Sequence, residues 1–575
     1  RALQPGESQT LCFEIPLESV ASYDDSGVTG HKSAWILEQG GYVFYAGADV
    51  RSASEAYSLT LPETVVRQCK SALGPLTAFK RMVNSSGKPE FEDVPLTGEA
   101  FPHDHAKLPA EIPQIGDRGI RLADVVNGKN TLEEFTAQLT DYDLSCIIRG
   151  EGMGSPKVTA GTAAAFGGVS DTLTALGIPC ACCDDGPSGM RLDCGTKAFS
   201  LPNGTLLAST FDRPLMTELF TFMGLEMHTN QVDCLLGPGM NIHRHPLNGR
   251  NFEYFSEDPY LTGEMASAEL AGLHSTGAEG TIKHFCGNNR ETRRHFLDSV
   301  ISERALREIY LRGFEKAVKK GGAKSVMTTY GQVNGVWTAG NYDLVTGILR
   351  DDWGFDGFTM TDWWANINRR GKAPDKSDFA AMAMAQNDVY MVTADGAACN
   401  DNTLDSLKSG ELTRGELQRN AMNILRFLTT THAMKRVMGC DDETEIINRP
   451  ADAGDVDSTD IEFHDIDEDL TLDLTGITTE KGSSYAFGLN VSKPGVYKVT
   501  LTASSTLSEL AQTSVSIFAL GSPCGMFTFN GTGGAPVSQT KDVKCLSNFM
   551  PIRLYFGGSG LKTQSIRFEL KERWT

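Results

Sequence analysis

The sequence has 575 residues, with 52 Lys and Arg against 73 Asp and Glu, so its formal net charge is −21 and its pI about 5.0. This acidity argues against a protein that binds nucleic acid or an anionic membrane. The sequence contains no run of about 18 apolar residues, so no membrane-spanning helix is expected. Its composition is that of a globular protein, and its length indicates about three or four domains.

The 13 cysteines are odd in number and scattered, and several lie in strand-like runs such as IPCACCDDGP (178–187). Free thiols in a reducing compartment are therefore expected, and we predict a cytoplasmic protein. A zinc site remains an alternative, because thiolate and imidazole both bind zinc. Its ligands would be Cys180, Cys182 and Cys183 with His243 and His245, or with His103 and His105. Paired CxxC spacing is lacking, so neither a metal nor a cofactor is expected.

Residues 1–112 contain short alternating runs, such as TLCFEIPL and AWILEQGGYVFYAGAD, separated by Gly, Asp and Ser clusters. Such runs are typical of a small antiparallel β-sandwich. A proline-rich stretch, FPHDHAKLPAEIPQIG (101–116), then marks a linker, since proline interrupts both helices and β-ladders.

Residues 113–432 alternate continuous apolar runs with longer helical segments, such as 210–229 and 302–321, the latter opening with Ser302 as a helix cap. Continuous apolar runs indicate buried parallel strands, and the alternation predicts a (β/α)8-type TIM barrel. We identify seven strands and expect an irregular eighth, or one near residues 119–127. The seven runs are DLSCIIRG, IPCACCDDGP, VDCLLGPGMNI, GTIKHFCGN, AKSVMTTYGQVNG, GFTMTDWW and NDVYMVT.

An acidic linker is predicted at residues 433–455, followed by a C-terminal β-sandwich at 456–575. The C-terminal runs, for example GVYKVTLTASS and QSIRFELKE, alternate apolar and polar residues as half-buried strands do. The fold class is therefore a multidomain chain with a central barrel flanked by two β-sandwiches.

Polar side chains follow the apolar runs of the predicted barrel, where catalytic groups of such barrels lie. These residues are Asp185, Arg250, Glu253, Lys283, His284, Tyr330 and Asp362. Trp363 is expected to be exposed beside them, whereas Glu253 is expected to hold loop structure and His295 to be a packing or surface residue. Charged groups that bond hydroxyls and an aromatic ring that stacks on a sugar are typical of a carbohydrate site.

Five ordered motifs carry a more specific resemblance. They are DDGPSGMR (184–191), GPGMNIHRHPLNGRNFEYFSEDPYLTG (237–263), KHFCGNNRETRRH (283–295), SVMTTYGQVNG (325–335) and WGFDGFTMTDWW (353–364). Together they resemble glycoside hydrolase family 3 of the β-glucosidase type. The resemblance implies a retaining mechanism with Asp362 as the nucleophile, and two arginines, Arg191 and Arg244, that orient the pocket. It also implies a glycone pocket formed by Asp185, Arg250, Lys283, His284, Met327, Tyr330 and Trp363.

The expected activity is that of an exo-acting β-glucosidase that needs no cofactor. KHFCGNN lacks the KHFxGHG run of the family's N-acetylglucosaminidase branch, which favours the β-glucosidase branch. Gly331 replaces an asparagine common in the family's motif, so a β-xylosidase or a β-galactosidase stays open. The other alternative is a non-catalytic carbohydrate-binding relative. Lys283 and Arg250 are expected to favour an ionised Asp362 by lowering its pKa.

Retaining glycosidases need two carboxyl groups about 5 to 5.5 Å apart, and we place only one. In the family, an α/β sandwich after the barrel supplies the acid/base, and a fibronectin type III-like domain follows it. The N-terminal segment resembles that fibronectin-like domain but precedes the barrel. The resemblance therefore implies a permuted order, with the acid/base on an upstream sandwich domain or on a second chain.

The expected partners are a β-glycoside substrate and the part that carries the acid/base. The C-terminal block loosely resembles carbohydrate-binding β-sandwiches, although its aromatic residues are more typical of a core. Three roles stay open for this block: to cover the barrel, to form a homodimer or to shape the aglycone subsite.

Overall fold

The computed structural model describes residues 3–74, 77–85, 87–94, 108–152, 155, 157–159, 162–192, 198–369, 372–393, 395–442, 444, 461–508, 511–520 and 522–574. The chain divides into two compact units. One contains Arg1–Phe101 and Val300–Leu311, and the other contains Pro102–Ser299 and Arg312–Thr575. Each is described by itself below.

The first unit consists of a three-stranded sheet in the order β1-β2-β5 and two hairpins, β3–β4 and β6–β7, all antiparallel. Its strands are β1 (Ser22–Asp24), β2 (Ala34–Leu37), β3 (Gly40–Ala46), β4 (Ser54–Leu61), β5 (Thr64–Gln68), β6 (Lys80–Ser85) and β7 (Lys88–Asp93), and a 3-10 turn, η1 (Leu17–Val20), precedes them. Tyr23, Trp35 and Cys69 form a small core. The Tyr23 hydroxyl donates to Glu303 at 2.7 Å, from the helical segment α8 (Glu303–Ala305) and η4 (Leu306–Tyr310).

The second unit contains the barrel. Its eight strands pair in the order β17-β14-β12-β11-β10-β9-β8-β18, and a parallel bridge between Met360 and Val389 closes the sheet. The strands are β8 (Arg149–Glu151), β9 (Ala164–Gly167), β10 (Cys180–Asp185), β11 (Cys234–Leu236), β12 (Glu279–Phe285), β14 (Ser325–Thr328), β17 (Phe358–Met360) and β18 (Tyr390–Thr393). The barrel predicted from alternating strands and helices is therefore present.

The eighth strand differs from its prediction. It is β9, a strand of four residues that runs antiparallel to both neighbours, whereas residues 119–127 contain helix α1 (Leu122–Val126). Its sequence, AAFG, is too short and too rich in small residues to stand out as an apolar run.

A second correction concerns the run DLSCIIRG. Most of it lies in helix α3 (Asp141–Ile147), and only Arg149–Glu151 forms the strand β8. The helix begins where Thr140 and Asp143 form a reciprocal capping box. Because its last five residues are all buried, the helix shows the same continuous apolar pattern as a buried strand.

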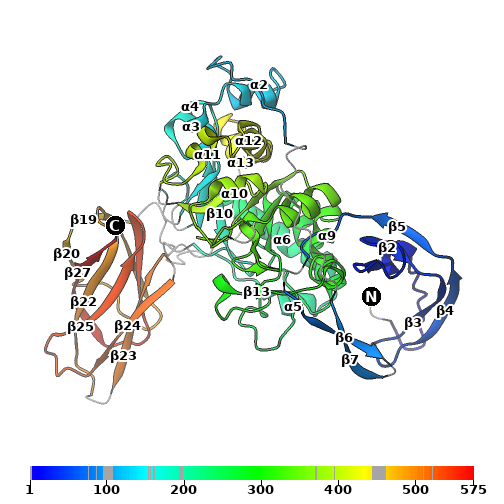
Figure 1. Cartoon of the computed structure of the whole chain (residues 1–575). Coiled ribbons are helices and arrows are strands. Elements are labelled where there is room, and N and C mark those ends of the chain that lie inside the picture. Colours follow the sequence, from blue (N-terminus) through cyan, green and yellow to red (C-terminus); the bar gives the residue numbers. More distant parts are fainter. Residues whose placement is uncertain are drawn as a thin grey trace. The chain divides into compact units, whose positions relative to one another are not determined.

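Helices lie around the barrel strands (Figure 1), with α7 against β12 and α12 against β17. They are α2 (Leu132–Ala137), α4 (Asp171–Ala175), α5 (Gly204–Ala208), α6 (Arg213–Thr229), α7 (Pro259–His274), α9 (Arg312–Lys319), the π-helix η6 (Asp343–Asp352), α10 (Phe379–Met384), α11 (Thr403–Ser409), α12 (Arg414–Leu428) and α13 (His432–Val437). Short elements between them are η3 (Arg294–Phe296), η5 (Thr338–Gly340) and a small sheet of β13 (Asp298–Ser299), β15 (Gln332–Val333) and β16 (Val336–Trp337). The predicted cap is confirmed, because the Ser302 hydroxyl accepts from Ala305 N at 3.2 Å.

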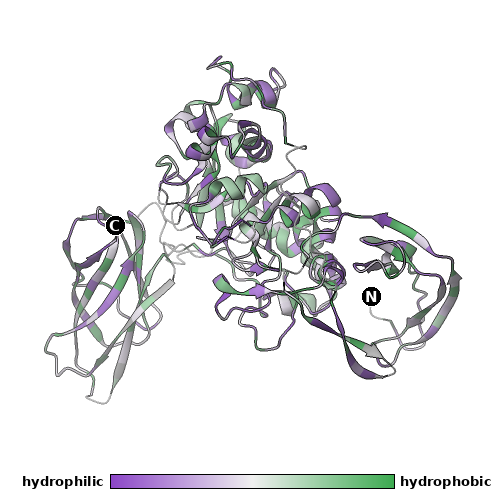
Figure 2. Cartoon of the chain, viewed as in Figure 1, coloured by the Kyte–Doolittle hydropathy of each residue, from purple (hydrophilic) through white to green (hydrophobic). Residues whose placement is uncertain are grey.

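The C-terminal residues form two sheets, in the orders β19-β21-β26-β23-β24 and β20-β27-β22-β25. The first has β19 (Phe463–Ile466), β21 (Ser484–Val491), β23 (Gln512–Ala519), β24 (Ser522–Asn530) and β26 (Phe549–Phe556), and the second has β20 (Asp469–Asp473), β22 (Gly495–Ser505), β25 (Val537–Cys545) and β27 (Leu561–Arg573). Hydrophobic and hydrophilic residues alternate along these strands (Figure 2), and Tyr497, Phe527 and Phe529 are buried in a core of their own. Of the predicted linker at 433–455, residues 433–437 instead lie in helix α13, and residues 443 and 445–455 lie outside the described part.

None of the helices in the described ranges is long and apolar enough to cross a bilayer.

A buried ion pair joins three elements around the barrel. Arg350 of η6 donates to Asp388 at 2.6 Å, and Asp388 also accepts from Thr359 N of β17 at 2.9 Å and from Asn423 of α12 at 3.1 Å. Asp388 is fully buried. Removing one member of such a pair leaves the other charge buried without compensation.

Asp388→Ala is therefore expected to lower the free energy of unfolding by about 3–5 kcal/mol. The matched control is Asp356→Ala, which removes an exposed partner of Lys324 and should cost less than about 1 kcal/mol. Urea unfolding followed by tryptophan fluorescence measures both. Equal losses in the two variants would contradict a structural role for the buried pair.

Candidate active site

The candidate site lies at the C-terminal ends of the barrel strands. Asp185 is the last residue of β10, and Lys283 and His284 lie near the end of β12. Met327 lies in β14 with Tyr330 just after it, and Asp362 and Trp363 follow β17. Because parallel strands end at the same side of the sheet, closure of the barrel brings these residues to one mouth.

Asp185 lies in an ion-pair group with two cations. Its carboxylate accepts from Lys283 at 2.8 Å and lies 3.5 Å from the Arg191 guanidinium. Burial opposes ionisation of Asp185, but the charges of Lys283 and Arg191 prevail and lower its pKa to about 2. Asp185 is thus an ionised acceptor and cannot donate a proton near neutral pH.

A second carboxyl group lies on the outer side of β12. Glu269 of α7 is 1% exposed, and its Oε1 has no hydrogen-bond partner among the described residues. Burial raises its pKa well above the ordinary value, although the charge of Lys283 acts in the opposite direction. Lys283 is itself 3% exposed. Lys283 therefore forms its hydrogen bond with Asp185, and its charge only partly offsets the effect of burial on Glu269.

Asp362 is held through only one of its oxygens. Its Oδ1 accepts from the Trp363 backbone N–H at 2.8 Å, whereas Oδ2 is buried with no hydrogen bond among the described residues. Burial raises the pKa of Asp362, against the lowering effects of Arg250, the Trp363 amide, Arg294 and Lys283. The expected lowering by Lys283 and Arg250 is present, but burial outweighs it. Within the described part of the chain, Oδ2 is therefore the unpaired oxygen of Asp362.

His284 faces this oxygen as a neutral ring. Its Nε2 lies 3.8 Å from Asp362 Oδ2, and burial together with the nearby cations lowers its pKa well below the usual value. Asn241 fixes its backbone through two hydrogen bonds of 2.9 Å, and the Tyr254 hydroxyl lies 3.2 Å from Nδ1. Because the His284 imidazole is neutral, the nearby cations and not His284 offset the negative charge of Asp362.

Four further side chains connect the remaining predicted residues. Arg250 donates to Glu253, which agrees with the structural role predicted for Glu253. Arg294 donates to Glu291 at 2.8 Å, and its guanidinium lies 4.5 Å from the centroid of the Tyr330 ring. Sequence reasoning missed Glu291 and Arg294, although both lie in the quoted motif KHFCGNNRETRRH. Their position in this motif was the only feature of the sequence that could have identified them as site residues.

Burial and the negative charge of Asp362 raise the pKa of Tyr330, so its hydroxyl stays protonated. His295 packs against the same ring at a centroid distance of 4.0 Å, as a packing residue would. Tyr330 is thus fixed between two neighbours, with a protonated hydroxyl on the side of Asp362.

The prediction for Trp363 is wrong in one respect. Trp363 is 9% exposed and packs in the core cluster with Met327 and Tyr330, whereas the next residue, Trp364, is 42% exposed. A positive φ of 53° at Trp364 turns the chain there, so the two rings of TDWW lie in different surroundings. Of the two orienting arginines, Arg191 contacts Asp185 and Arg244 is exposed.

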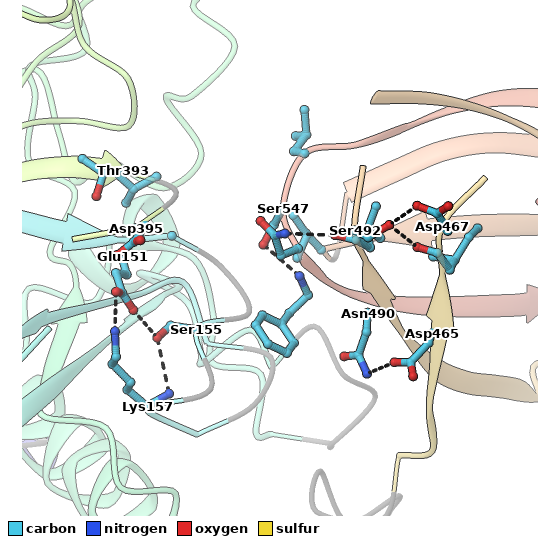
Figure 3. Close-up of a pocket in the computed structure, with 18 of the residues that line it drawn as sticks. Glu151, Ser155, Lys157, Thr393, Asp395, Asp465, Asp467, Asn490, Ser492 and Ser547 are labelled. Atoms are coloured by element: carbon cyan, nitrogen blue, oxygen red, sulfur yellow. Dashed lines mark hydrogen bonds and ion pairs between the residues drawn. The ribbon is translucent and has the colours of Figure 1, made fainter. Parts of the chain in front are cut away.

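Glu151, at the end of β8, takes part in an ion pair. It accepts from Lys157 at 2.5 Å and from Ser155 at 2.8 Å, as Figure 3 shows. On the C-terminal sandwich, Asn490 and Ser492 likewise bind Asp465 and Asp467. These acidic groups are occupied by local contacts.

The predicted zinc alternatives do not converge among the described residues, and His103 and His105 lie outside them. The group with metal-ligand types that does converge there is His228, His432 and Asp441. Its rings stack at 3.8 Å, His432 Nδ1 lies 2.6 Å from Asp441, and Nε2 faces the Thr276 carbonyl at 2.8 Å. These contacts join α6 and α13 to the residues that follow α13.

The sequence matches the family model described as the glycosyl hydrolase family 3 N terminal domain over residues 114–427. It is 59% identical over 590 residues to a beta-glucosidase of Ruminococcus albus, with 100% of this chain and 62% of the relative covered. A beta-glucosidase A of Butyrivibrio fibrisolvens is 35% identical over 463 residues, which cover 76% of this chain and 53% of the relative.

Among solved structures, a beta-glucosidase from Paenibacillus barengoltzii aligns with a TM-score of 0.72 and 42% identity. The alignment covers 96% of this chain and 61% of that structure. The chain therefore spans between 53% and 62% of the length of these three relatives.

Replacing the buried carboxyl group of Glu269 should stabilise the protein in a pH-dependent way. The pKa of Glu269 is higher in the folded than in the unfolded state. Above the ordinary Glu pKa, the unfolded state therefore binds fewer protons than the folded state. The free energy of unfolding thus falls as the pH rises from the ordinary Glu pKa to the raised one. Glu269→Gln removes this penalty. The variant should be more stable than the unaltered protein at pH 8 and should gain much less near pH 4.5.

Thermal and urea unfolding at several pH values measure the gain. Glu218→Gln, at an exposed position of α6, is the matched control and should show no such trend. A Glu269→Gln gain that is the same at every pH would rule out ionisation as its cause.

Proposed function

The chain belongs to glycosyl hydrolase family 3, and on that premise we propose that it is the barrel-bearing part of a retaining, exo-acting β-glucosidase. The observation that carries the proposal is the Asp362 carboxylate, with one oxygen held by a backbone amide, the other unpaired among the described residues, and three cationic side chains that lower its pKa against burial. The names of the relatives in Ruminococcus albus and Paenibacillus barengoltzii support glucose as the glycone.

In this proposal Asp362 attacks the anomeric carbon and forms a covalent glycosyl-enzyme that water then hydrolyses. The nucleophile must be ionised although it is buried. Arg250, Arg294 and Lys283 supply the opposing positive charge, and none of the three has to approach within bonding distance to do so. The hydrogen bond from the Trp363 amide fixes Oδ1 and so aims Oδ2.

Asp185 and Lys283 are proposed to bind the hydroxyls of the glycone. The ionised carboxylate accepts from hydroxyl groups, and the ammonium group donates to them. A sugar with one hydroxyl inverted or missing would lose these charge-assisted contacts, which discriminates between epimers. Glucose is favoured over xylose and galactose by the names of the relatives. Met327, Trp363 and Tyr330 would form the apolar wall.

We propose that the acid/base carboxyl group lies on a part of the enzyme outside this chain, on an α/β sandwich or on a second chain. The described carboxylates of the mouth support this. Asp185 is ionised with a pKa of about 2, Glu253 and Glu291 pair with Arg250 and Arg294, and Glu151 pairs with Lys157. A general acid must hold its proton near neutral pH. The greater length of the relatives is consistent with such a part.

The cytoplasmic location and a homodimer formed through the C-terminal sandwich stay predictions. The twelve cysteines in the described ranges are all free, which supports a reducing compartment.

Incubation with an activated 2-deoxy-2-fluoro-β-glucoside is expected to label Asp362, because the fluorine slows the second step and traps the glycosyl-enzyme. Peptide mapping by mass spectrometry locates the label. Asp362→Asn should show no label and should lose at least about 10³-fold in kcat. Sugar binding without any label in the unaltered chain would instead favour a non-catalytic carbohydrate-binding relative.

The leaving group separates the nucleophile from the acid/base. The chain alone should release a dinitrophenolate from its β-glucoside but should be about 10²- to 10⁴-fold poorer on an alkyl β-glucoside than an enzyme with general acid help. Steady-state rates on the two substrates, repeated with the matching xyloside and galactoside, test acid placement and glycone together. Efficient cleavage of the alkyl glucoside by residues 1–575 would show that the acid lies within this chain.

A further inference from the structure

The first and last strands of the barrel meet at one place, which we call the barrel seam. There β8 and β18 pair in parallel, with Tyr390 opposite Arg149 and Thr393 opposite Glu151. The segments next to the seam are α3, before β8, and residues 395–402, between β18 and α11. Each carries a cysteine, Cys146 in α3 and Cys399 in the second segment.

The two thiols are close together. Cys146 Sγ lies 4.0 Å from Cys399 Sγ, although 253 positions of sequence separate the residues. A disulfide has a sulfur–sulfur length of about 2.05 Å, so an approach of about 2 Å is needed. Cys146 lies in the last turn of α3 and Cys399 in the segment between β18 and α11, so neither is in a paired strand, and side-chain rotation can supply this movement.

The surroundings of the two sulfurs differ. Cys399 is partly exposed and accepts from the Arg149 guanidinium at 3.1 Å, with the Ser145 hydroxyl at 3.3 Å. Arg149 also pairs with Asp401 through Nε at 2.7 Å, so Nη1 is the part of the guanidinium that faces the thiol. The Arg149 guanidinium thus lies directly beside a sulfur that is accessible from solution.

Cys146 is fully buried. Burial and the neighbouring Cys399 raise its pKa to about 11, so it is a thiol at neutral pH. A buried sulfur next to a reactive one cannot meet an oxidant in solution, but it can attack a neighbouring oxidised sulfur. Cys183 and Cys234 also lie opposite each other, in β10 and β11, but both are fully buried, so neither sulfur can meet an oxidant in solution.

We propose that Cys146 and Cys399 are a modification site, at which a peroxide oxidises Cys399 and Cys146 then closes a reversible disulfide across the barrel seam. This inference does not rest on the proposed function, because it concerns the closure of the barrel and not the pocket.

The chemistry takes two steps. The Cys399 thiolate attacks one oxygen of hydrogen peroxide, the O–O bond breaks, and a sulfenic acid and a water form once the leaving hydroxide is protonated. The Cys146 sulfur then attacks the sulfenic sulfur, the S–S bond forms, and the S–O bond breaks to release a second water that takes the thiol proton. Two thiols and one peroxide thus give one disulfide and two waters.

The bond would close a loop that includes nearly the whole barrel, because Cys146 precedes its first strand and Cys399 follows its last. Cross-links over long loops restrict the unfolded chain most. The disulfide is therefore expected to raise the thermal stability of the barrel.

The test uses the full chain, treated with a small excess of hydrogen peroxide, alkylated and digested without reductant. Mass spectrometry should find the Cys146–Cys399 peptide pair, and dithiothreitol should remove it. Cys146→Ser should leave a sulfenic acid on Cys399 that a dimedone reagent traps, whereas Cys399→Ser should leave Cys146 unmodified. This asymmetry checks the two roles, and both changes are nearly isosteric, so folding is preserved.

Oxidation should raise the melting temperature of the unaltered chain by about 5 °C and leave that of either single variant unchanged. Cys440→Ser, at an exposed position, is the matched control and should behave as the unaltered chain. Oxidation of the exposed Cys12 and Cys440 in a sample with no Cys146–Cys399 link would overturn the site. A Cys146–Cys399 link without a rise in melting temperature would contradict the proposal that the disulfide stabilises the barrel.

Discussion

Closure of the eight-stranded sheet is the constraint on which the other features of this molecule depend. The bridge between Met360 and Val389 joins β17 to the residues before β18, and the pairing of β8 with β18 completes the ring. Only a closed sheet gathers the ends of β10, β12, β14 and β17 at one mouth. The buried Arg350–Asp388 pair lies at the β17–β18 side of this closure, where it joins the sheet to the helices that cover it.

At the mouth of the barrel, burial opposes the ionisation of the carboxyl groups, and nearby cations favour it. Asp185 is ionised because two cations lie close to it, and Asp362 keeps a raised pKa because its cations lie farther away. The Asp185 side chain is 30% exposed and that of Asp362 is 9% exposed, so the two carboxylates differ in burial as well as in neighbours. The environment thus assigns one of them to fixed binding contacts and leaves the other with a free oxygen.

The sequence allowed most of the barrel to be predicted, because buried parallel strands are short apolar runs followed by polar residues. The strand ends at Asp185, Lys283 and Asp362 were found in this way. Strand β9 was missed because four small residues give no periodic signal, and α3 was mistaken for a strand because a fully buried helix has none either.

Other features depend on distance in space, which one sequence does not contain. The burial of Trp363 beside an exposed Trp364, the contact of Arg294 with Tyr330, and the net pKa of Asp362 all follow from packing. The proximity of Cys146 and Cys399 could not be foreseen for the same reason.

The reversed direction of β9 makes the rim of the barrel unequal. Seven strands present their carboxyl ends to the mouth, whereas β9 presents its amino end there, after the chain has crossed the rim from β8. A change in length between β8 and β9 would therefore move no strand end that carries Asp185, Lys283 or Asp362. This sector of the rim can therefore change in length while the residues at the ends of β10, β12 and β17 stay in register.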